Sequence, residues 1–332
     1  MIEKARREGK RYINPVPTAV GDWSTFFKIL RRYLTNRQER TPKRTLGPFR
    51  TDIQLYERPP ASGLRVTWMG HSSMLLEIDG MRVLIDPVWE ERAAPVQWAG
   101  PKRFFAPPLR LEELPRIDVV LLSHDHFDHF GSETLPRLAR IEAAAGAIWV
   151  MPLGVGQILK NLGIPQAIEL DWTESIRVGK LELTALPARH FSGRSLFTRF
   201  QTLWASFVLA GPKHRVYYGA DSGEWAGFKE IAEAYGPFDL TMLEIGAFDP
   251  LWADIHMGPD GALRTFQAMG AKGLMMPIHW GLFDLALHGW RQPIERIFAV
   301  EGLKIWAPEP GLPTEVCEET ELRSEWWRPQ EG

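Results

Sequence analysis

The feature that most constrains this chain is the segment at residues 121–133, LLSHDHFDHFGSE. It places three of the nine histidines, and two aspartates, within six consecutive positions directly after the apolar run IDVVLL. Histidines two residues apart on an extended backbone point to the same side, and a following turn returns the next polar residues toward them. Burying so many titratable groups is costly unless a cation holds them. The segment therefore predicts a site for two adjacent metal ions, with the ligands His124, His126, Asp128 and His129.

The bulk composition is that of a globular protein without an internal disulfide. Of 332 residues, 45% are hydrophobic and 24% are charged, which is enough apolar material for a sizeable core. The single cysteine, Cys317, excludes an intrachain disulfide and a cysteine-ligated structural zinc site. No uncharged apolar run reaches ~18 residues, and MIEKARREGKRYINP lacks the apolar centre of a signal peptide, so we expect a cytoplasmic location. The net charge of −2 argues against bulk nucleic-acid binding.

Residues 1–63 are predicted to form a basic N-terminal arm ahead of the main domain. The first 50 residues carry thirteen Lys and Arg against four Asp and Glu, and the stretch 40–63 is proline-rich and irregular. Within the arm, DWSTFFKILRRYLTN has apolar residues at helical spacing, namely Trp23, Phe26, Phe27, Leu30 and Leu34. We expect this amphipathic helix to pack on the domain's own core. The alternative is a peripheral contact with the inner face of an anionic membrane.

Residues 64–332 are predicted to form one domain of mixed strands and helices. Short apolar runs separated by Gly and Asp-Gly turns, LRVTWMG, SSMLLEIDG and MRVLIDPVW, predict consecutive antiparallel strands from residue 64 onward. Further strands are expected in IDVVLLSH, AIWVMPL, KLELTALPA, TLWASFVLA, HRVYYGAD, LTMLEIGAF and GLMMPIHWG. Helices are expected in SETLPRLARIEAAA, VGQILKNLG and PDGALRTFQAMGA.

Three later strand ends offer further ligands. LPARHFSG ends an apolar strand at His190, YYGADSGEW ends one at Asp221, and MMPIHWG ends one at His279. Taken alone, such a residue is more often a turn or cap residue. Three strands that each end in a ligand-type residue fit a geometry in which several strands deliver side chains to one edge of a sheet. We therefore expect these three side chains to meet the histidine-rich segment.

In this order, the candidate ligands resemble the metal-ligand series of the metallo-β-lactamase-fold hydrolases. Over roughly residues 64–290, the chain further resembles the N-acyl-phosphatidylethanolamine-hydrolysing phospholipase D branch and its bacterial relatives. The segments that carry this resemblance are WMGHSSMLLEIDG, LIDPVW, IELDW, ARHFSGR, LWASFVL, IGAFDPLW and PIHWGLFDL. The resemblance implies an α/β fold, a four-layer αββα sandwich with two mixed sheets packed face to face. It also implies hydrolysis of a phosphodiester in an amphiphilic, lipid-like substrate.

Carried onto this chain, the resemblance implies two metal sites. It assigns a first ion to His124, His126 and His190, and a second to Asp128, His129 and His279. Asp221 would bridge both ions, because a carboxylate has two oxygens. A hydroxide between the ions would be the nucleophile, since cations lower the pKa of bound water toward ~7. Imidazole and carboxylate ligands suit zinc, which we expect, and they also accept iron or manganese.

Other residues are expected to support or line this site. His71 in GHSS and Asp86 in LIDP stand at strand ends and would orient the ligands, although a purely structural hydrogen bond is an equal alternative for each. His256 in DIHMGPD resembles the family's histidine that contacts the substrate phosphate, and we group it with Asp128 and Asp221 as catalytic. The residues expected to line the substrate pocket are Phe191, Arg194, Glu244, Trp252 and Trp280.

Three interpretations of function remain. The favoured one is a dinuclear metal-dependent phosphodiesterase of the phospholipase D type. The alternative is a lactonase or other carboxylic-ester hydrolase on the same fold. Two departures from the phospholipase pattern slightly favour this alternative. Glu244 stands where that pattern has proline and would add a negative charge near a phosphodiester, and the stretch between Trp252 and His256 is shorter than in that pattern. A nuclease is disfavoured, because the 57 residues between Asp221 and His279 are too few for an inserted nucleic-acid clamp. A non-catalytic metal-binding scaffold would predict a lost ligand, and all seven are present. The sequence indicates neither the physiological substrate nor the oligomeric state.

Overall fold

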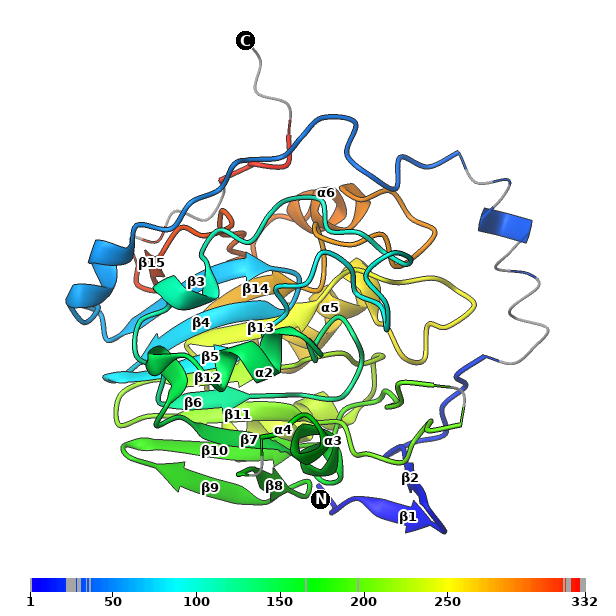
Figure 1. Ribbon diagram of the computed structural model, residues 1–332. Helices are drawn as coiled ribbons and strands as arrows, with labels where there is room; N and C mark the ends of the chain where they lie inside the picture. The colour runs from blue at the N-terminus through cyan, green and yellow to red at the C-terminus, as the bar shows by residue number, and fades with distance from the viewer. Residues whose placement is uncertain are drawn as a thin grey trace.

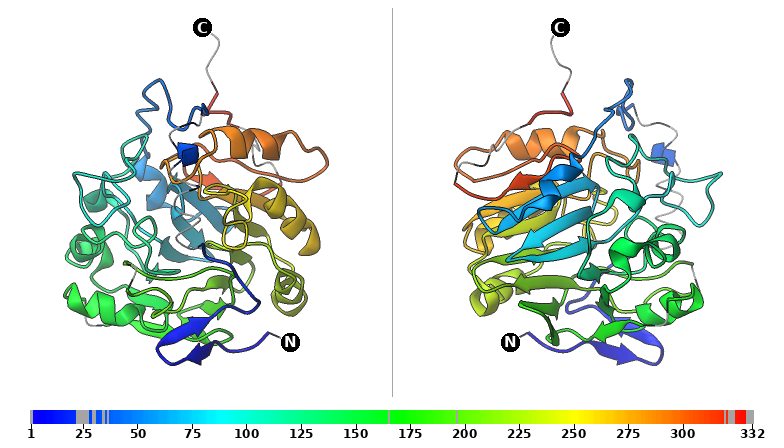
Figure 2. Two further views of the ribbon diagram at one scale, coloured as in Figure 1. Left: turned by 90° about the vertical axis from the view of Figure 1, so that its right-hand side faces the viewer. Right: turned by 60° about the vertical axis from the view of Figure 1, so that its left-hand side comes forward.

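The computed structural model describes residues 2–21, 28, 31–33, 35, 37–164, 166–195, 197–318, 320 and 324–328 (Figure 1). In this part of the chain, two large β-sheets face each other and helices cover both outer faces, which the side views in Figure 2 show most clearly. This arrangement is the four-layer αββα sandwich that we expected, so the prediction of the fold class is confirmed.

The first large sheet contains the three antiparallel strands that the turn signals predicted. Leu64–Gly70 (β3), Ser73–Ile78 (β4) and Met81–Ile85 (β5) pair in sequence order. The turn between β4 and β5 has Asp79 and Gly80 at positive φ, 50° and 84°, as a two-residue hairpin loop requires. Parallel strands continue the sheet, and its full order is β15 (Thr314–Glu315), β3, β4, β5, β6 (Val119–Leu121), β7 (Ile148–Pro152) and β8 (Ile168–Leu170).

The second large sheet brings four strand ends to one edge. Its order is β14 (Leu274–Ile278), β13 (Leu240–Glu244), β12 (Arg215–Tyr218), β11 (Ser206–Ala210), β10 (Leu181–Leu186) and β9 (Ser175–Val178). Both β10 and β12 run antiparallel to β11, whereas β12, β13 and β14 run parallel to one another. Consequently β10, β12, β13 and β14 all end at the same edge.

Helices cover the outer faces of the two sheets. The seven-stranded sheet is covered by α2 (Thr134–Leu138) and α3 (Val155–Asn161), and the six-stranded sheet by α4 (Gly227–Tyr235), α5 (Gly258–Ala268) and α6 (Gln292–Phe298). Short 3-10 helices lie at Ile53–Glu57 (η1), Leu111–Glu113 (η2) and Glu142–Ala144 (η3). The single helix expected over SETLPRLARIEAAA is instead divided into α2 and η3, because the backbone at Ile141 is extended. Among the described helices, none combines the length and apolarity needed to cross a bilayer.

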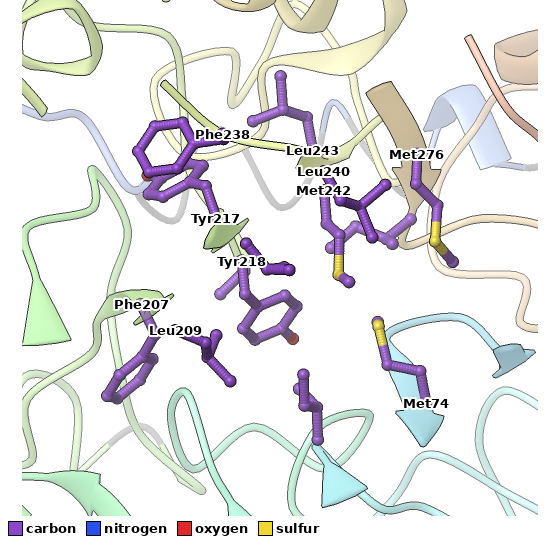
Figure 3. Packing of buried hydrophobic residues seen from close by; sticks show 14 of the residues in the cluster. Met74, Phe207, Leu209, Tyr217, Tyr218, Phe238, Leu240, Met242, Leu243 and Met276 are labelled. Carbon is purple, nitrogen blue, oxygen red and sulfur yellow. The ribbon is translucent and has the colours of Figure 1, made fainter. Parts of the chain in front are cut away.

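The main core lies between the two sheets. Tyr218 on β12 and Met242 on β13 point toward Met74 on β4 of the opposite sheet (Figure 3), and all three are fully buried. On the outer face of β4, Leu75 packs in a second cluster that includes Leu135 of α2. Successive residues of β4 are therefore buried on opposite faces, which explains why this strand reads as a continuous apolar run.

The N-terminal arm lies against the main domain over its described residues. Arg6–Glu8 (β1) and Arg11–Ile13 (β2) form a small antiparallel sheet. Tyr12 is buried against the main core, and its backbone N–H donates to the carbonyl of Phe200 at 2.8 Å. The expected amphipathic helix is a prediction that falls outside the described residues, because Trp23, Phe26, Phe27, Leu30 and Leu34 are all among those not described.

Candidate metal centre

The seven predicted ligands meet where strands of both sheets end. His124 follows β6 of the seven-stranded sheet by three residues, and His279 directly follows β14 of the six-stranded sheet. The backbone turns sharply at this edge, because His71 and His279 have φ of 57° and 61° and Asp86 has φ of 39°. Left-handed backbone at a residue other than glycine costs of order 1–3 kcal/mol, and such strain concentrates at functional sites.

The first group of ligand atoms consists of His124, His126, His190 and Asp221, and all four atoms lie within 4.8 Å of one another. The Nε2 of His124 lies 2.9 Å from Nδ1 of His126, which lies 3.3 Å from Nε2 of His190. Asp221 closes the group, since its Oδ2 lies 3.6 Å from Nε2 of His190 and 3.9 Å from Nε2 of His124.

The second group contains Asp128, His129 and His279 together with His71. Asp128 Oδ2 lies 3.2 Å from Nε2 of His279 and 3.7 Å from Nε2 of His129. Asp221 reaches this group as well, because its Oδ1 lies 3.1 Å from His129 Nε2 and its Oδ2 lies 3.0 Å from His279 Nε2. Asp221 is therefore the one predicted ligand that stands between both groups in the described part of the chain.

The spacing and the unsatisfied atoms fit a pair of cations. Ligands about 2.0–2.1 Å from a tetrahedral zinc ion would be ~3.4 Å apart, and the four separations given above for the first group run from 2.9 to 3.9 Å, with all four atoms within 4.8 Å of one another. His129 Nε2 and Asp221 Oδ1 are buried and make no hydrogen bond of acceptable geometry with any described residue. Buried polar atoms without partners are rare and need an explanation such as a bound ion.

The charges of the site also favour a cation. Burial lowers the pKa of His124 and His190 well below the usual range, so both rings are neutral ligands at neutral pH. Burial would raise the pKa of Asp221, but His129 and His279 hold it well below its usual range. Burial likewise would lower the pKa of His279, whereas Asp221 and Asp128 raise it to about 10. The ionised carboxylates of the buried Asp221 and the half-buried Asp128 thus hold positive charge at the centre of the site, which also raises the pKa of His129.

Comparisons with known proteins identify the family. Residues 81–280 match the family described as "Beta-lactamase superfamily domain". The chain belongs to the metallo-β-lactamase superfamily. It is 45% identical over 278 residues to an uncharacterized protein of Mycobacterium tuberculosis (strain ATCC 25618 / H37Rv), which covers 82% of this chain and 73% of that protein. It is 32% identical over 302 residues to N-acyl-phosphatidylethanolamine-hydrolyzing phospholipase D 1 of Caenorhabditis elegans, covering 85% and 83%.

A solved structure agrees with the fold. The metallo hydrolase Igni18 of Ignicoccus hospitalis KIN4/I superposes with a TM-score of 0.57 at 21% identity, covering 75% of this chain and 97% of that one. Together with the relatives, this likeness places the chain among the metal-dependent hydrolases. The expected resemblance to the superfamily and to its phospholipase D branch is therefore confirmed.

In this metallo-β-lactamase-fold hydrolase, Asp86 organises the histidine-rich loop from beneath. Its carboxylate is fully buried and accepts hydrogen bonds from the backbone N–H of Ser123 at 2.7 Å, from Nδ1 of His129 at 2.7 Å and from the hydroxyl of Tyr218 at 2.5 Å. An N–H at Nδ1 leaves Nε2 of His129 as the atom that faces the site. His71 supports the other side, because its Nε2 lies 2.9 Å from Asp128 Oδ2. Both residues contact predicted ligands, and their orienting role stays a prediction.

Arg194 and Trp280, which we expected in the pocket wall, make other contacts. Arg194 clamps the histidine-rich loop, since it donates to the carbonyl of Asp125 at 2.6 Å and lies over the ring of Phe127 at 3.8 Å. Trp280 is 3% exposed and stacks on Trp68 in the core. Trp280 also lines the small cavity that reaches His71 and His279, so its place in the pocket wall stays a prediction, and the main contacts of Arg194 are to the histidine-rich loop.

Phe191 lies at the edge of the site, whereas Trp252 packs within the loop that follows β13. Phe191 is half-buried, and its ring lies 4.6 Å from that of His126. Trp252 is also half-buried and donates from Nε1 to the carbonyl of Ala247 at 2.6 Å. Phe191 therefore leaves apolar ring surface beside His126, and a pocket role for Trp252 stays a prediction.

Glu244 does not present a free negative charge to a substrate. It is fully buried at the end of β13, and Oε1 accepts from the backbone N–H groups of Ser222 and Met257 at 3.1 and 3.0 Å. Its Oε2 lies 2.6 Å from Nδ1 of His256. Glu244 therefore orients His256, and the slight support that this carboxylate gave to the lactonase alternative disappears.

No role was predicted from the sequence for two residues that are buried at the site. Asp125 lies inside the histidine-rich segment, and its carboxylate accepts from the backbone N–H of Gly193 at 2.7 Å and from Thr202 Oγ1 at 2.9 Å. Its position in the sequence between His124 and His126, two predicted ligands, could have indicated a role at this site. Asn14, in the N-terminal arm, hydrogen-bonds to the backbone of His190. No local pattern marks Asn14, because its partner lies 176 residues away.

Proposed function

We propose that this chain is a dinuclear metal-dependent phosphodiesterase that cleaves an amphiphilic, lipid-like phosphodiester. The observation that carries this proposal is the position of Asp221 between two groups of histidine and carboxylate ligands. His124, His126 and His190 would hold one ion, and Asp128, His129 and His279 the other. Two divalent cations, zinc in the first instance, would supply an activated water and neutralise charge on phosphoryl oxygens. The name of the Caenorhabditis elegans relative, a phospholipase D, supports the phosphodiester.

His256 is placed to contact the reacting phosphate. Its ring lies 5.1 Å from that of His190 and 5.2 Å from that of His279, so it stands beside both ligand groups. The side chain keeps 12% of its surface exposed, whereas its partner Glu244 is fully buried. Because Glu244 engages Nδ1, the other ring nitrogen is left for substrate. We assign His256 to a hydrogen bond with a phosphoryl or leaving-group oxygen.

Replacing His256 by alanine is expected to lower kcat by roughly 10²–10³-fold, which is the usual cost of removing one hydrogen-bond donor to the charge that develops in the transition state. The amount of bound metal should stay at the wild-type level. Steady-state hydrolysis of bis-p-nitrophenyl phosphate and metal analysis of the same samples measure both quantities. Glu244→Gln should lower kcat less. If His256→Ala lost metal in proportion to activity, His256 would be a ligand instead of a substrate contact.

A basic cleft beside the metal centre fits an anionic substrate. The cleft has a volume of about 730 Å³, and its charged lining residues are four cations and one carboxylate, namely Lys43, Arg44, Lys102, Arg103 and Asp284. Phe104 and Asp284 line this cleft and also a small cavity that reaches His71 and His279. Burial lowers the pKa of Arg103 to about 10, which still leaves it charged at neutral pH. A phosphate-containing head group would meet favourable charge there.

Reversing two exposed charges of the cleft, Lys43→Glu with Arg44→Glu, is expected to raise KM for an anionic phosphodiester by ~5–30-fold, from about 1–2 kcal/mol of lost attraction. KM for a neutral phosphate triester should stay near wild type, and so should kcat for both substrates. The matched control is Lys160→Glu with Lys180→Glu, two exposed lysines outside the cleft lining. Sedimentation of both variants with anionic vesicles tests the alternative that the arm makes a peripheral membrane contact. Equal KM changes in the two variants would contradict a role for the cleft.

A substrate panel separates the phosphodiesterase from its rival. Purified protein would be analysed for metal and assayed on bis-p-nitrophenyl phosphate, on N-acyl-phosphatidylethanolamine in mixed micelles and on several lactones. The proposal expects about two equivalents of metal and cleavage of the phosphodiesters. Cleavage of lactones without any phosphodiester cleavage would establish the carboxylic-ester hydrolase instead.

A further inference from the structure

The backbone of His190 is held by a single side chain from the far end of the sequence. Asn14 Nδ2 donates to the carbonyl of His190 at 2.7 Å, and the backbone N–H of His190 donates to Asn14 Oδ1 at 2.9 Å. Asn14 is 7% exposed and His190 is fully buried. The amide thus replaces the neighbouring strand that His190 lacks beyond the end of β10, and it satisfies two buried backbone groups at once.

The ring of His190 is fixed by a separate contact. Its Nδ1 lies 3.0 Å from the carbonyl of Ile255, so the proton belongs on Nδ1 and Nε2 faces His126. Ile255 sets the rotation of the ring, whereas Asn14 sets the position of the backbone from which the ring extends. Both constraints are required to place Nε2 within a few tenths of an ångström.

Contacts on both sides of Asn14 fasten the arm at this place. Before it, the N–H of Tyr12 donates to Phe200. After it, Arg189 donates to the carbonyl of Pro17 at 2.9 Å and pairs with Asp254 at 2.8 Å. The N–H of Ala19 also donates to Asp254 Oδ2, at 2.8 Å. The arm is therefore anchored to both loops that flank His190, the one that carries Arg189 and the one that carries Asp254.

We propose that Asn14 is a positioning residue for the metal centre. Residues 12–19 of the arm anchor Asn14 to the loops around His190 and so contribute to the position of this ligand. This inference rests on the assignment of His190 as a metal ligand in the proposed function. The region that matches the superfamily begins at residue 81, so this element lies outside that region. Loss of a group that positions a metal ligand typically weakens metal affinity by about 10–100-fold.

The test measures metal affinity directly in the full-length protein. Apo protein would be titrated with Zn²⁺ against a chromophoric chelator, and with Co²⁺ to record the visible spectrum of each site. Asn14→Ala is expected to weaken one of two ions by ~10–100-fold and leave the other unchanged. Asn14→Asp, which keeps the acceptor and loses the donor, should weaken the same ion. The control is Lys4→Ala, which removes only an exposed ion pair of the same arm with Glu174, 2.7 Å long, and should bind like wild type.

Each outcome is decisive. Unchanged affinity for both ions in folded Asn14 variants, or an equal weakening of both ions that follows a drop in thermal stability, would overturn the inference. If Asn14→Ala does not fold, Asn14→Asp decides the matter by the same titration. If the wild-type protein itself binds fewer than two ions, the proposed metal centre fails, and that result is distinct from any difference between variants.

Discussion

Asp221→Ala is expected to lower kcat by at least about 10³-fold, the equivalent of ~4 kcal/mol in the barrier, and to reduce the bound metal below two equivalents. The reason is that the two oxygens of this buried carboxylate lie 3.0 and 3.1 Å from His279 and His129 of the second group, and Oδ2 also lies 3.6 Å from Nε2 of His190 in the first group. Removing it would take a ligand from both ions at once and would leave His129 and His279 without their main counter-charge. Metal analysis and hydrolysis of bis-p-nitrophenyl phosphate measure the two effects.

A buried carboxylate elsewhere in the same fold provides the control. Glu77 is 3% exposed on β4 and pairs with Arg82 at 3.1 Å. Glu77→Gln should reduce stability while keeping metal content and turnover near wild type. Full metal content and turnover in Asp221→Ala would contradict the proposed centre, because Asp221 is the carboxylate assigned to both ions.

Asp86→Ala is expected to lower the free energy of unfolding by about 3–5 kcal/mol, which is the cost of removing one member of a buried charged network. The substitution would leave the N–H of Ser123, Nδ1 of His129 and the hydroxyl of Tyr218 without an acceptor in the core. Tyr218 belongs to the six-stranded sheet and Asp86 follows β5 of the seven-stranded sheet, so the same change also weakens the contact between the sheets. Urea denaturation of metal-free wild type and variant measures this loss.

Asp86→Asn gives a sharper comparison because it keeps the size of the side chain. The carboxylate also accepts from Ser123 Oγ, and an amide must direct its own N–H₂ at one or more of these donors, so we expect a smaller but clear loss of stability. Metal binding should also weaken, since His129 would lose the acceptor that fixes its ring. A free energy of unfolding equal to that of wild type in both variants would show that the network does not stabilise the fold.

The metal centre was largely predictable because its signals are local. A histidine two residues from another, or an aspartate directly after an apolar strand, is visible within a few positions of sequence, as at His124 and Asp221. Strand direction then brings such residues together, because β10, β12 and β14 end at the same edge. Local patterns therefore predicted side chains that the structure brings together, whereas the four-layer sandwich was implied by the resemblance to the family.

The supporting contacts were not predictable, because they depend on pairs of residues far apart in the chain. Asn14 reaches His190 across 176 positions, and nothing near Asn14 distinguishes it from a turn residue. Glu244 was interpreted as a charge in the pocket, since the sequence does not show that three donors already occupy its carboxylate. Arg194 and Trp280 lie in the expected loops, but rotamers and packing decided the direction of each side chain.

The position of the ligands at the ends of two different sheets has a thermodynamic consequence. His124 and His126 follow a strand of the seven-stranded sheet, whereas His190 follows a strand of the six-stranded sheet. Asp221 lies within reach of all three and of the second ligand group. Cations bound there would cross-link the halves of the sandwich, so the melting temperature would rise with free metal concentration. At a hundred times Kd, a single site that exists only in the folded protein adds about 2.7 kcal/mol. Removing the metal with a chelator would then lower the free energy of unfolding of the sandwich as well as turnover.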